Sequence, residues 1–318
     1  MRVLIIGGSG FIGSFATIKF LENKHQVVNV DSLTYAGDNS RLSEIKNHKN
    51  YKFYKLDLNN KNIKKIFTTF KPHCLINFAA ESHVDNSINN PNKFITTNVN
   101  GVFNLLKISN DFYKKNKKFF FYQISTDEVF GSIKNKSFNS KSSYLPNSPY
   151  AASKAAADLL VRSWNKTYGL PIIISYCTNN YGPKQHVEKF IPKIISNAFS
   201  NKKIPVYGNG KNVRDWIYVE DHVGAIYKIT NSKKVNSRYF IGGRNTKTNL
   251  QIIDEIVTII GNRKLNKLIK FTKDRLGHDL RYSISVSNNL KNLGWKKTTS
   301  LKQGLKKTIQ WYKKNLKI

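Results

Sequence analysis

Two adjacent carboxylates follow a strongly apolar stretch in the middle of the chain. The run KKFFFYQI ends at Ile124 and leads into STDEVF, which places Thr126, Asp127 and Glu128 where an expected buried strand stops. Because neighbouring carboxyls in a partly dry site repel each other, one can stay protonated while the other is ionised. Such a pair can remove a carbon-bound proton and protonate a departing hydroxyl, which is what elimination of water requires. The alternative is a solvated acidic turn.

A tyrosine and a lysine stand four residues apart a little further along. The segment SPYAASKAAADLLVRSW carries Tyr150 and Lys154 among strong helix formers, so a helix places both side chains on one face. The lysine charge is expected to lower the pKa of the phenol, which then takes a hydroxyl proton while a hydride leaves the same carbon. A surface pair is the alternative, because this spacing also arises by chance.

Three glycines at the start of the chain predict a dinucleotide site. In VLIIGGSGFIGS, Gly7, Gly10 and Gly13 follow an apolar run and open an expected helix. Glycines there allow a tight turn and a close approach of the backbone to a pyrophosphate at the helix N-terminus. Asp31 ends the second expected strand, where its carboxylate can accept both ribose hydroxyls and repel a 2′-phosphate, which favours NAD over NADP. Asp57 ends the third expected strand and suits a contact near the adenine.

The elements that must position these residues alternate along the first half of the chain. Strands are expected at 2–6, 26–30, 51–56, 73–78, 118–124 and 171–176, and helices at 11–23, 59–70, 91–115 and 149–168. This alternation predicts an α/β fold with a Rossmann-type, doubly wound parallel sheet. We expect an NAD-binding domain over 1–178, with a return segment near 212–230. Shorter segments punctuated by Gly and Pro predict a smaller C-terminal α/β region for substrate over 179–318.

Composition narrows the protein class. The 318 residues suit one large domain or two closely packed ones, and neither an export signal nor a membrane span is expected from the sequence. The two cysteines, Cys74 and Cys177, have no metal-site spacing, and the scattered histidines predict no metal site. The formal charge of +34 would suit nucleic-acid binding, but the lysines are spread in short groups, so we expect no specific nucleic-acid partner.

The motifs, taken in order, resemble one family. They are GGSGFIGS, VDSLTYAGDN, NFAAESHVDNSI, TNVNG, ISTDEVFG, SPYAASKAAADLLVRSW, NNYGP, EKFIP, PVYGNG, VRDWIYVEDH and DRLGHDLRY. Together they make the chain resemble the extended short-chain dehydrogenase/reductases, and within them the dTDP-glucose 4,6-dehydratases, over nearly its whole length. The resemblance implies an NAD-dependent hydro-lyase that converts dTDP-glucose to a 4-keto-6-deoxy sugar. It also implies a homodimer joined through 91–115 and 149–168. With no export signal expected, Cys74 and Cys177 are expected to be reduced thiols in the cytoplasm.

The resemblance assigns a role to each residue considered so far. Tyr150 would deprotonate the glucosyl 4-hydroxyl with help from Lys154 and Thr126, Glu128 would take the C5 proton, and Asp127 would protonate the leaving 6-hydroxyl. The implied cofactor contacts are Gly7, Gly10, Phe11, Ile12, Gly13, Asp31, Ser32, Leu33, Thr34, Asp57, Leu58, Phe78, Ala79, Ala80, Ser82, Thr97, Tyr150, Lys154 and Asn180. The implied substrate contacts are Ser82, Thr126, Asn179, Lys189, Phe190, Pro205, Val206, Tyr207, Arg214, Asn249, Asp274, Arg275 and His278.

Several alternatives stay open on the sequence alone. Arg214 suits bidentate contact with a diphosphate, but it can instead form a structural salt bridge to Asp215 or Glu220. His278 can be a packing or capping group. Another nucleotide-sugar 4,6-dehydratase or 4-epimerase, acting on a UDP-, CDP- or GDP-sugar, would share most of these motifs, although an epimerase does not require Asp127 and Glu128. A basic NAD- or RNA-binding protein without catalytic activity is the alternative from a different class.

Overall fold

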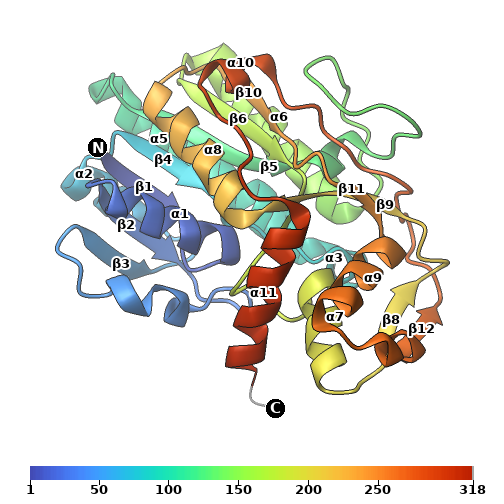
Figure 1. Cartoon of the computed structure of the whole chain (residues 1–318). Coiled ribbons are helices and arrows are strands. Elements are labelled where there is room, and N and C mark those ends of the chain that lie inside the picture. Colours follow the sequence, from blue (N-terminus) through green and yellow to red (C-terminus); the bar gives the residue numbers. More distant parts are fainter. Residues whose placement is uncertain (317–318) are drawn as a thin grey trace.

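The computed structural model describes residues 1–316 and is built around one sheet of seven parallel strands (Figure 1). In spatial order the strands are β10 (Ser237–Ile241), β6 (Ile172–Cys177), β5 (Phe120–Thr126), β4 (Cys74–Asn77), β1 (Arg2–Ile6), β2 (Gln26–Asp31) and β3 (Tyr51–Lys55). From β1 the chain proceeds through β2 to β3 on one side of the sheet, and then from β4 through β5 and β6 to β10 on the other side. The strand order therefore reverses between β1 and β4. This is a doubly wound Rossmann-type sheet, which confirms the predicted fold class.

Helices cover both faces of the sheet because its strands are apolar on both sides. Along β1, Leu4 and Ile6 pack in one cluster of buried side chains and Val3 and Ile5 in another, as the alternation of a strand requires. The first cluster includes residues of α2 (Ile63–Phe70), α5 (Gly101–Lys115) and α6 (Pro149–Tyr168). The second includes residues of α1 (Phe11–Glu22) and α8 (Val219–Ser232).

The helix expected over 91–115 is present but is not uniform. It begins as α4 (Pro91–Phe94), widens into a π-helical segment, η2 (Ile95–Asn100), and continues as α5. Within η2 the side chain of Asn98 accepts from the backbone N–H of Glu81 and donates to its carbonyl oxygen and to Ser153 Oγ. The wider turn therefore lets Asn98 tie the segment after β4 to α6. A π-helical turn of this kind is set by tertiary contacts that a helical sequence pattern does not reveal.

The later part of the chain builds a smaller lobe and also returns to the main sheet. Its two small sheets are β11 (Thr246–Thr248), β9 (Val213–Tyr218) and β7 (Asn179–Tyr181), and β12 (Ile269–Thr272) with β8 (Ile204–Tyr207). The lobe's helices are α7 (Phe190–Phe199), α9 (Asn249–Ile260) and α11 (Leu301–Asn315), with α10 (Asn288–Asn292) beside β10. The short helices are α3 (Val84–Asn89), η1 (Asn39–Ile45), η3 (Asp127–Phe130) and η4 (Arg263–Leu268). The returning part comprises α8 and β10, and so extends beyond 230.

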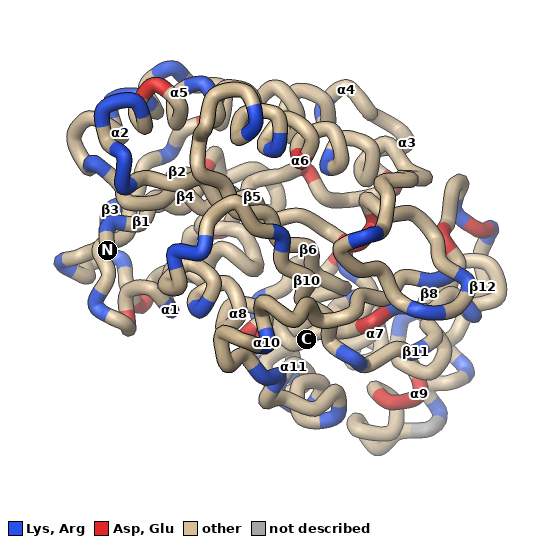
Figure 2. Tube along the Cα trace, turned by 90° about the horizontal axis from the view of Figure 1, so that it is seen from above, with Lys and Arg blue, Asp and Glu red and all other residues tan. Residues whose placement is uncertain are grey.

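Basic residues are distributed over the whole trace rather than along one element (Figure 2). Lysines and arginines occur on α2, α5, α11 and the smaller lobe, with acidic residues interspersed. No helix within the described part of the chain combines the length and apolar character needed to cross a bilayer. The two cysteines are buried and unpaired.

Candidate active site

The two carboxylates lie where β5 stops and a single 3₁₀ turn begins. Thr126 is the last residue of β5 and pairs with Cys177 of β6, two residues beyond the expected strand end. Its hydroxyl caps η3 by accepting from the backbone N–H of Glu128 at 3.3 Å, and it donates to Oδ1 of Asp127 at 3.3 Å. Asp127 is 2% exposed and Glu128 is partly buried. The pair therefore does not form a solvated turn.

Helix α6 begins beside this turn and carries the predicted tyrosine and lysine. The Ser148 hydroxyl caps it by accepting from the N–H of Ala151 at 3.1 Å, and Pro149 occupies the first turn, where a missing N–H costs nothing. Tyr150 and Lys154 are both buried. The ammonium of Lys154 donates to the carbonyl oxygen of Ile124 at 2.8 Å, which fastens α6 to the end of β5. The alternative of a surface pair is excluded by this burial.

The electrostatic environment affects the pKa values of the two carboxyl groups differently. Burial, and then the nearby Glu128 and Asp215, raise the pKa of Asp127 well above its usual range. Burial also raises the pKa of Glu128, but the cations of Arg214, Arg275 and Lys189 oppose that rise. Oδ2 of Asp127 is buried and has no hydrogen-bond partner among the described residues. Of the two carboxyl groups, Asp127 is therefore the better suited to hold a proton and Glu128 the better suited to ionise.

The pKa of the Tyr150 phenol is raised, whereas the spacing of Tyr150 and Lys154 predicted that it would be lowered. Burial, followed by the negative charge of Glu128, raises the pKa of Tyr150 well above its usual range, while a hydrogen-bonding interaction with Thr126 lowers it. Burial also lowers the pKa of Lys154. Desolvation therefore dominates the pKa of the phenol, and the expected lowering by Lys154 is not among its main causes.

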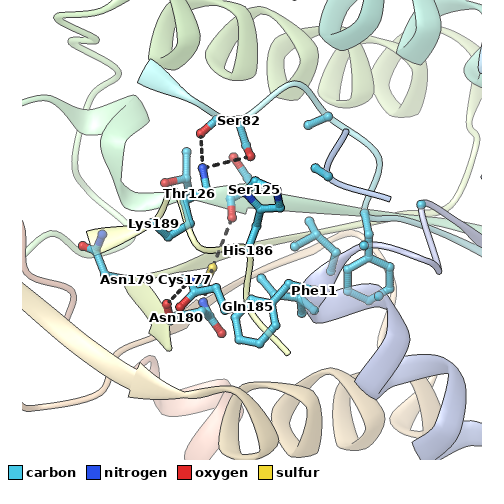
Figure 3. A pocket seen from close by; sticks show the side chains of 18 of the residues that line it. Phe11, Ser82, Ser125, Thr126, Cys177, Asn179, Asn180, Gln185, His186 and Lys189 are labelled. Carbon is cyan, nitrogen blue, oxygen red and sulfur yellow. Dashed lines mark hydrogen bonds between the residues drawn. The ribbon is translucent and has the colours of Figure 1, made fainter. Parts of the chain in front are cut away.

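These groups share one cavity of about 280 Å³ with the glycine loop. Figure 3 shows part of the lining of this cavity, with Ser82, Asn180 and Lys189 among the labelled residues. Lys189 reaches across it and donates to the carbonyl oxygen of Ser82 at 3.0 Å. Asn180 lies on the opposite side, where its Oδ1 is 2.8 Å from Nδ1 of the buried His222. Of the predicted residues, this cavity is lined by Gly7, Gly10, Phe11, Ile12, Gly13, Phe78, Ala80, Ser82, Thr126, Asp127, Glu128, Tyr150, Lys154, Asn179, Asn180 and Lys189.

The glycine loop leaves room for a backbone-bound ligand. Gly7 has φ of +81°, and a Cβ there would lie 2.6 Å from the backbone nitrogen of Ala79. A Cβ on Gly13 would lie 2.1 Å from the carbonyl oxygen of Gly7. Gly10 caps α1 without a side chain, so the first N–H groups of that helix remain free to meet a phosphate. The residues present therefore fit a dinucleotide.

A second cavity continues from this loop along the ends of β2 and β3. Among the predicted residues it is lined by Gly7, Gly10, Asp31, Ser32, Thr34, Asp57, Leu58, Phe78, Ala79, Ala80 and Thr97. Asp31 accepts from the backbone N–H of Ser9 at 2.9 Å and of Leu33 at 2.8 Å. Each carboxylate oxygen has two acceptor sites, so two backbone bonds leave capacity for ribose hydroxyls. The backbone amides thus fix the orientation of the carboxylate.

A third cavity opens from Glu128 toward the smaller lobe. Among the predicted residues it is lined by Ser82, Glu128, Asn179, Lys189, Phe190, Pro205, Tyr207, Arg214, Asn249, Arg275 and His278. Arg214 is held by carbonyl oxygens of Val213 and Asp279, both at 2.9 Å, and lies 4.4 Å from the centre of the Tyr282 ring. Asp215 instead accepts from the backbone of Gly243 and Asn245. The alternative of a salt bridge from Arg214 to Asp215 or Glu220 does not occur among the described residues.

Three predicted residues do not line these cavities. Leu33 contributes its backbone N–H to Asp31, and the Val206 side chain is buried in the core of the smaller lobe. Asp274 is half-exposed, and its Oδ1 lies 2.6 Å from Nδ1 of His278. His278 itself lines the third cavity, so its ring both contacts Asp274 and forms part of the cavity wall. The binding roles of these residues stay predictions.

Sequence reasoning missed a cluster that bridges the third cavity. Asp85 of α3 forms an ion pair with Arg275, with 2.5 Å between Oδ1 and Nε, and accepts from the hydroxyl of Tyr207 at 3.0 Å. Glu188 also lines this cavity beside Lys189. Asp85 stands inside the quoted motif ESHVDNSI, but no local pattern indicates a partner so distant in the chain. Only the fold brings them together.

Comparison with known proteins gives consistent matches along the chain. The model of the GDP-mannose 4,6 dehydratase family matches residues 4–308. A dTDP-glucose 4,6-dehydratase of Haemophilus influenzae is 43% identical, with 98% of each chain covered.

Solved structures give the same result. A Bacillus anthracis dTDP-glucose 4,6-dehydratase in complex with NAD is 40% identical with a TM-score of 0.90, covering 99% of this chain and 97% of that one. A Streptomyces venezuelae dTDP-glucose 4,6-dehydratase with NAD and TYD bound is 36% identical with a TM-score of 0.94, covering 99% and 98%. These matches confirm the resemblance first seen in the motifs. The chain belongs to the dTDP-glucose 4,6-dehydratase family, within the wider group that the GDP-mannose 4,6 dehydratase model describes.

Proposed function

We propose that this protein is an NAD-dependent hydro-lyase that converts dTDP-glucose to dTDP-4-keto-6-deoxyglucose. The observation that carries the proposal is the convergence of Asp127, Glu128, Tyr150 and Lys154 on one cavity. That cavity shares the glycine loop with the cavity along β2 and β3, and shares Ser82, Glu128 and Lys189 with the cavity facing the smaller lobe. A dinucleotide on one side and a nucleotide sugar on the other would therefore meet at the carboxylates.

The chain's own residues account for the proton transfers. When bound, NAD supplies the hydride acceptor for C4 of the sugar and the hydride donor for C6. Tyr150 must be ionised before it can take the proton of the 4-hydroxyl, and the positive charge of Lys154, one helical turn away, favours that phenolate form. The resulting ketone acidifies C5, whose proton passes to Glu128. Asp127, whose pKa is raised by burial, gives its proton to the 6-hydroxyl as that group leaves as water.

The proton balance assigns a second task to Thr126. Glu128 returns its proton to C5, so each turnover leaves one extra proton on Tyr150 and one too few on Asp127. The Thr126 hydroxyl interacts with Tyr150 and donates to Asp127. In the proposed mechanism this hydroxyl passes the proton from the phenol to the carboxylate, which resets both groups inside the buried site.

The remaining predicted residues divide between the two ligands by position. The cofactor site is formed by the glycine loop, Asp31, Asp57 and the residues after β4. The diphosphate of the substrate is held by Lys189, Arg214 and Arg275, whose cations line the third cavity. Asn249, Pro205 and Tyr207 line the same cavity, and we assign them to the nucleoside of the substrate.

The direct test is a product assay across nucleotide sugars. The purified protein is incubated separately with dTDP-glucose, UDP-glucose, CDP-glucose and GDP-mannose, and alkali then reveals the 4-keto product by its ultraviolet absorbance. We expect the strongest signal from dTDP-glucose, and none from Asp127→Asn. A stronger signal from another nucleotide would support the alternative dehydratases. No signal from any sugar, together with salt-sensitive RNA binding, would support a basic binding protein instead.

We further propose that the protein is a homodimer and that it works in the cytoplasm. The support for a dimer is an apolar face on neighbouring helices, where Ile95, Phe103, Leu159 and Tyr168 are 47–54% exposed. Such a face suits burial against a second copy. The support for the cytoplasm is the pair of free thiols, which persist in a reducing compartment. Cell fractionation tests the location.

A further inference from the structure

A buried carboxyl group that the mechanism does not use lies one helical turn beyond Lys154. Asp158 is fully buried on α6, at a spacing of four from Lys154 and on the same face as Tyr150. Its Oδ2 accepts from the hydroxyl of Ser125 at 2.5 Å, and its Oδ1 is buried without a partner among the described residues. Ser125 directly precedes Thr126 on β5. The carboxyl of Asp158 is thus fixed against the strand that carries the active-site residues.

Lys154 needs a compensating charge because its own surroundings disfavour the ammonium. Its hydrogen bond to the carbonyl oxygen of Ile124 is to a neutral acceptor, whereas a buried ammonium is normally paired with an anion. Burial lowers the pKa of Lys154, and the largest effect that opposes this is the charge of Asp158. In return, burial raises the pKa of Asp158 to about 7 against the opposing charge of Lys154.

The other charged and titratable groups around Asp158 form hydrogen bonds with other residues. Arg238 of β10 is exposed and donates to the carbonyl oxygen of Ser140 at 2.6 Å. The hydroxyls of Tyr144 and of Tyr176 on β6 are 2.5 Å apart and hydrogen-bond each other, and burial raises the pKa of both. Among these groups only Lys154 is a buried cation, so the charge of Asp158 acts mainly on it.

We propose that Asp158 is a positioning residue, whose carboxylate, held by Ser125, keeps Lys154 charged and directed along the Tyr150 face of α6. The proposal rests on the proposed function for its catalytic meaning, since a charged Lys154 matters because it assists proton removal by Tyr150. It goes beyond that function by adding an acidic residue to the tyrosine and lysine pair.

The first test measures the charge of Lys154 without any turnover. Protein labelled with ¹³C-lysine is titrated by NMR, and the Lys154 signal is assigned by its loss in Lys154→Gln. Asp158→Asn keeps the shape and the oxygen that accepts from Ser125 but removes the charge. We expect the apparent pKa of Lys154 to fall by about one unit in Asp158→Asn. Asp111→Asn, which removes an exposed carboxylate on α5, should leave it unchanged. An unchanged Lys154 pKa in Asp158→Asn would overturn the proposal.

The second test links that charge to the reaction. In a Glu128→Gln background, where elimination is blocked, the rate of nicotinamide reduction on adding dTDP-glucose is followed across pH. Adding Asp158→Asn should move the alkaline limb of this profile toward lower pH, because Lys154 then loses its proton earlier. A lower rate with an unmoved limb would show a structural role only. If the nicotinamide is not reduced in the Glu128→Gln variant and the wild-type protein is also inactive, the result counts against the proposed function. The NMR titration would then still decide the role of Asp158.

Discussion

The hydroxyl of Thr126 donates to Oδ1 of Asp127 at 3.3 Å, at the point where β5 passes into η3. The same hydroxyl interacts with Tyr150 and lowers the pKa of that phenol against the effect of burial. One small side chain therefore donates to the proposed acid for the 6-hydroxyl and affects the pKa of the proposed base for the 4-hydroxyl. In the proposed mechanism, the proton gained by Tyr150 passes along this side chain to the group that lost one.

Removing the Thr126 hydroxyl is expected to slow the reset between turnovers. In Thr126→Val, rapid mixing with excess dTDP-glucose should give a burst of about one product per site, followed by a steady rate roughly 10- to 100-fold slower. Thr126→Ser retains a hydroxyl and should show no burst. If Thr126→Val has equal first-turnover and steady-state rates, Thr126 does not return the proton. Quenched-flow product analysis separates the two phases.

Replacing Glu128 by glutamine should separate oxidation from elimination. The amide cannot take the C5 proton, so product formation should fall by roughly 10²- to 10⁴-fold, while the absorbance of enzyme-bound NADH accumulates on mixing. Glu220→Gln, on an exposed part of α8, is the matched control and should turn over normally. Normal turnover of Glu128→Gln would remove Glu128 from its proposed role.

Tyr150→Phe should prevent even the first half-reaction. The phenyl ring retains the packing of the buried side chain against Phe94, whose ring centre is 6.3 Å away, but it cannot accept the proton of the 4-hydroxyl. We expect no NADH signal on mixing with dTDP-glucose, although the nucleotide should still bind by calorimetry. Detectable NADH formation in this variant would show that another group acts as the base.

The raised pKa of Asp127 predicts how stability depends on pH. A carboxyl whose pKa is higher in the folded than in the unfolded state holds its proton more tightly when folded, so its contribution to stability is lost as pH rises through the folded pKa. Asp127→Asn is expected to reduce the fall in unfolding free energy that sets in as pH rises above about 4, the ordinary pKa of an aspartate. Urea titrations at several pH values measure this. An identical pH dependence in both proteins would contradict the raised pKa.

Arg214 is expected to contribute strongly to nucleotide binding. A lysine cannot reproduce a planar guanidinium placed over the ring of Tyr282. Arg214→Lys should therefore weaken binding of dTDP by about 1.5–3 kcal/mol, which is roughly 10- to 150-fold in affinity. Calorimetric titration measures the change. Arg238→Lys, on the exposed face of β10, is the control and should bind dTDP normally. Equal affinities for both variants would place the diphosphate elsewhere.

The exposed apolar face on α5 and α6 is expected to join two copies of the chain. Phe103 is 47% exposed and contacts the ring of Trp164 on α6. Phe103→Asp should convert a dimer into a monomer in sedimentation velocity, because it places a charge in the buried interface. Phe271→Asp changes a similarly exposed ring on β12 and should not alter the mass. A monomeric wild-type protein would contradict the proposed dimer.

Periodicity and local motifs in the sequence were sufficient for the fold class and for much of the site. Strands that are apolar throughout have to be covered on both faces, so the alternation of strands and helices led directly to the doubly wound sheet. The glycines after β1 and the Tyr150 and Lys154 spacing are local features, since a few successive residues define them. They could therefore be located without knowledge of the rest of the chain.

Only the tertiary structure decided which environment each group experiences. The pKa of Asp127 depends on burial and on Glu128, Asp215 and Arg214, and the pairing of Asp85 with Arg275 joins residues 190 positions apart in the chain. The buried contact of Asp158 with Ser125 likewise connects a helix to a strand. Desolvation and the approach of charges are properties of packing in three dimensions. The sequence determines which chemical groups are present, whereas the fold determines the pKa shifts and the contact partners of those groups.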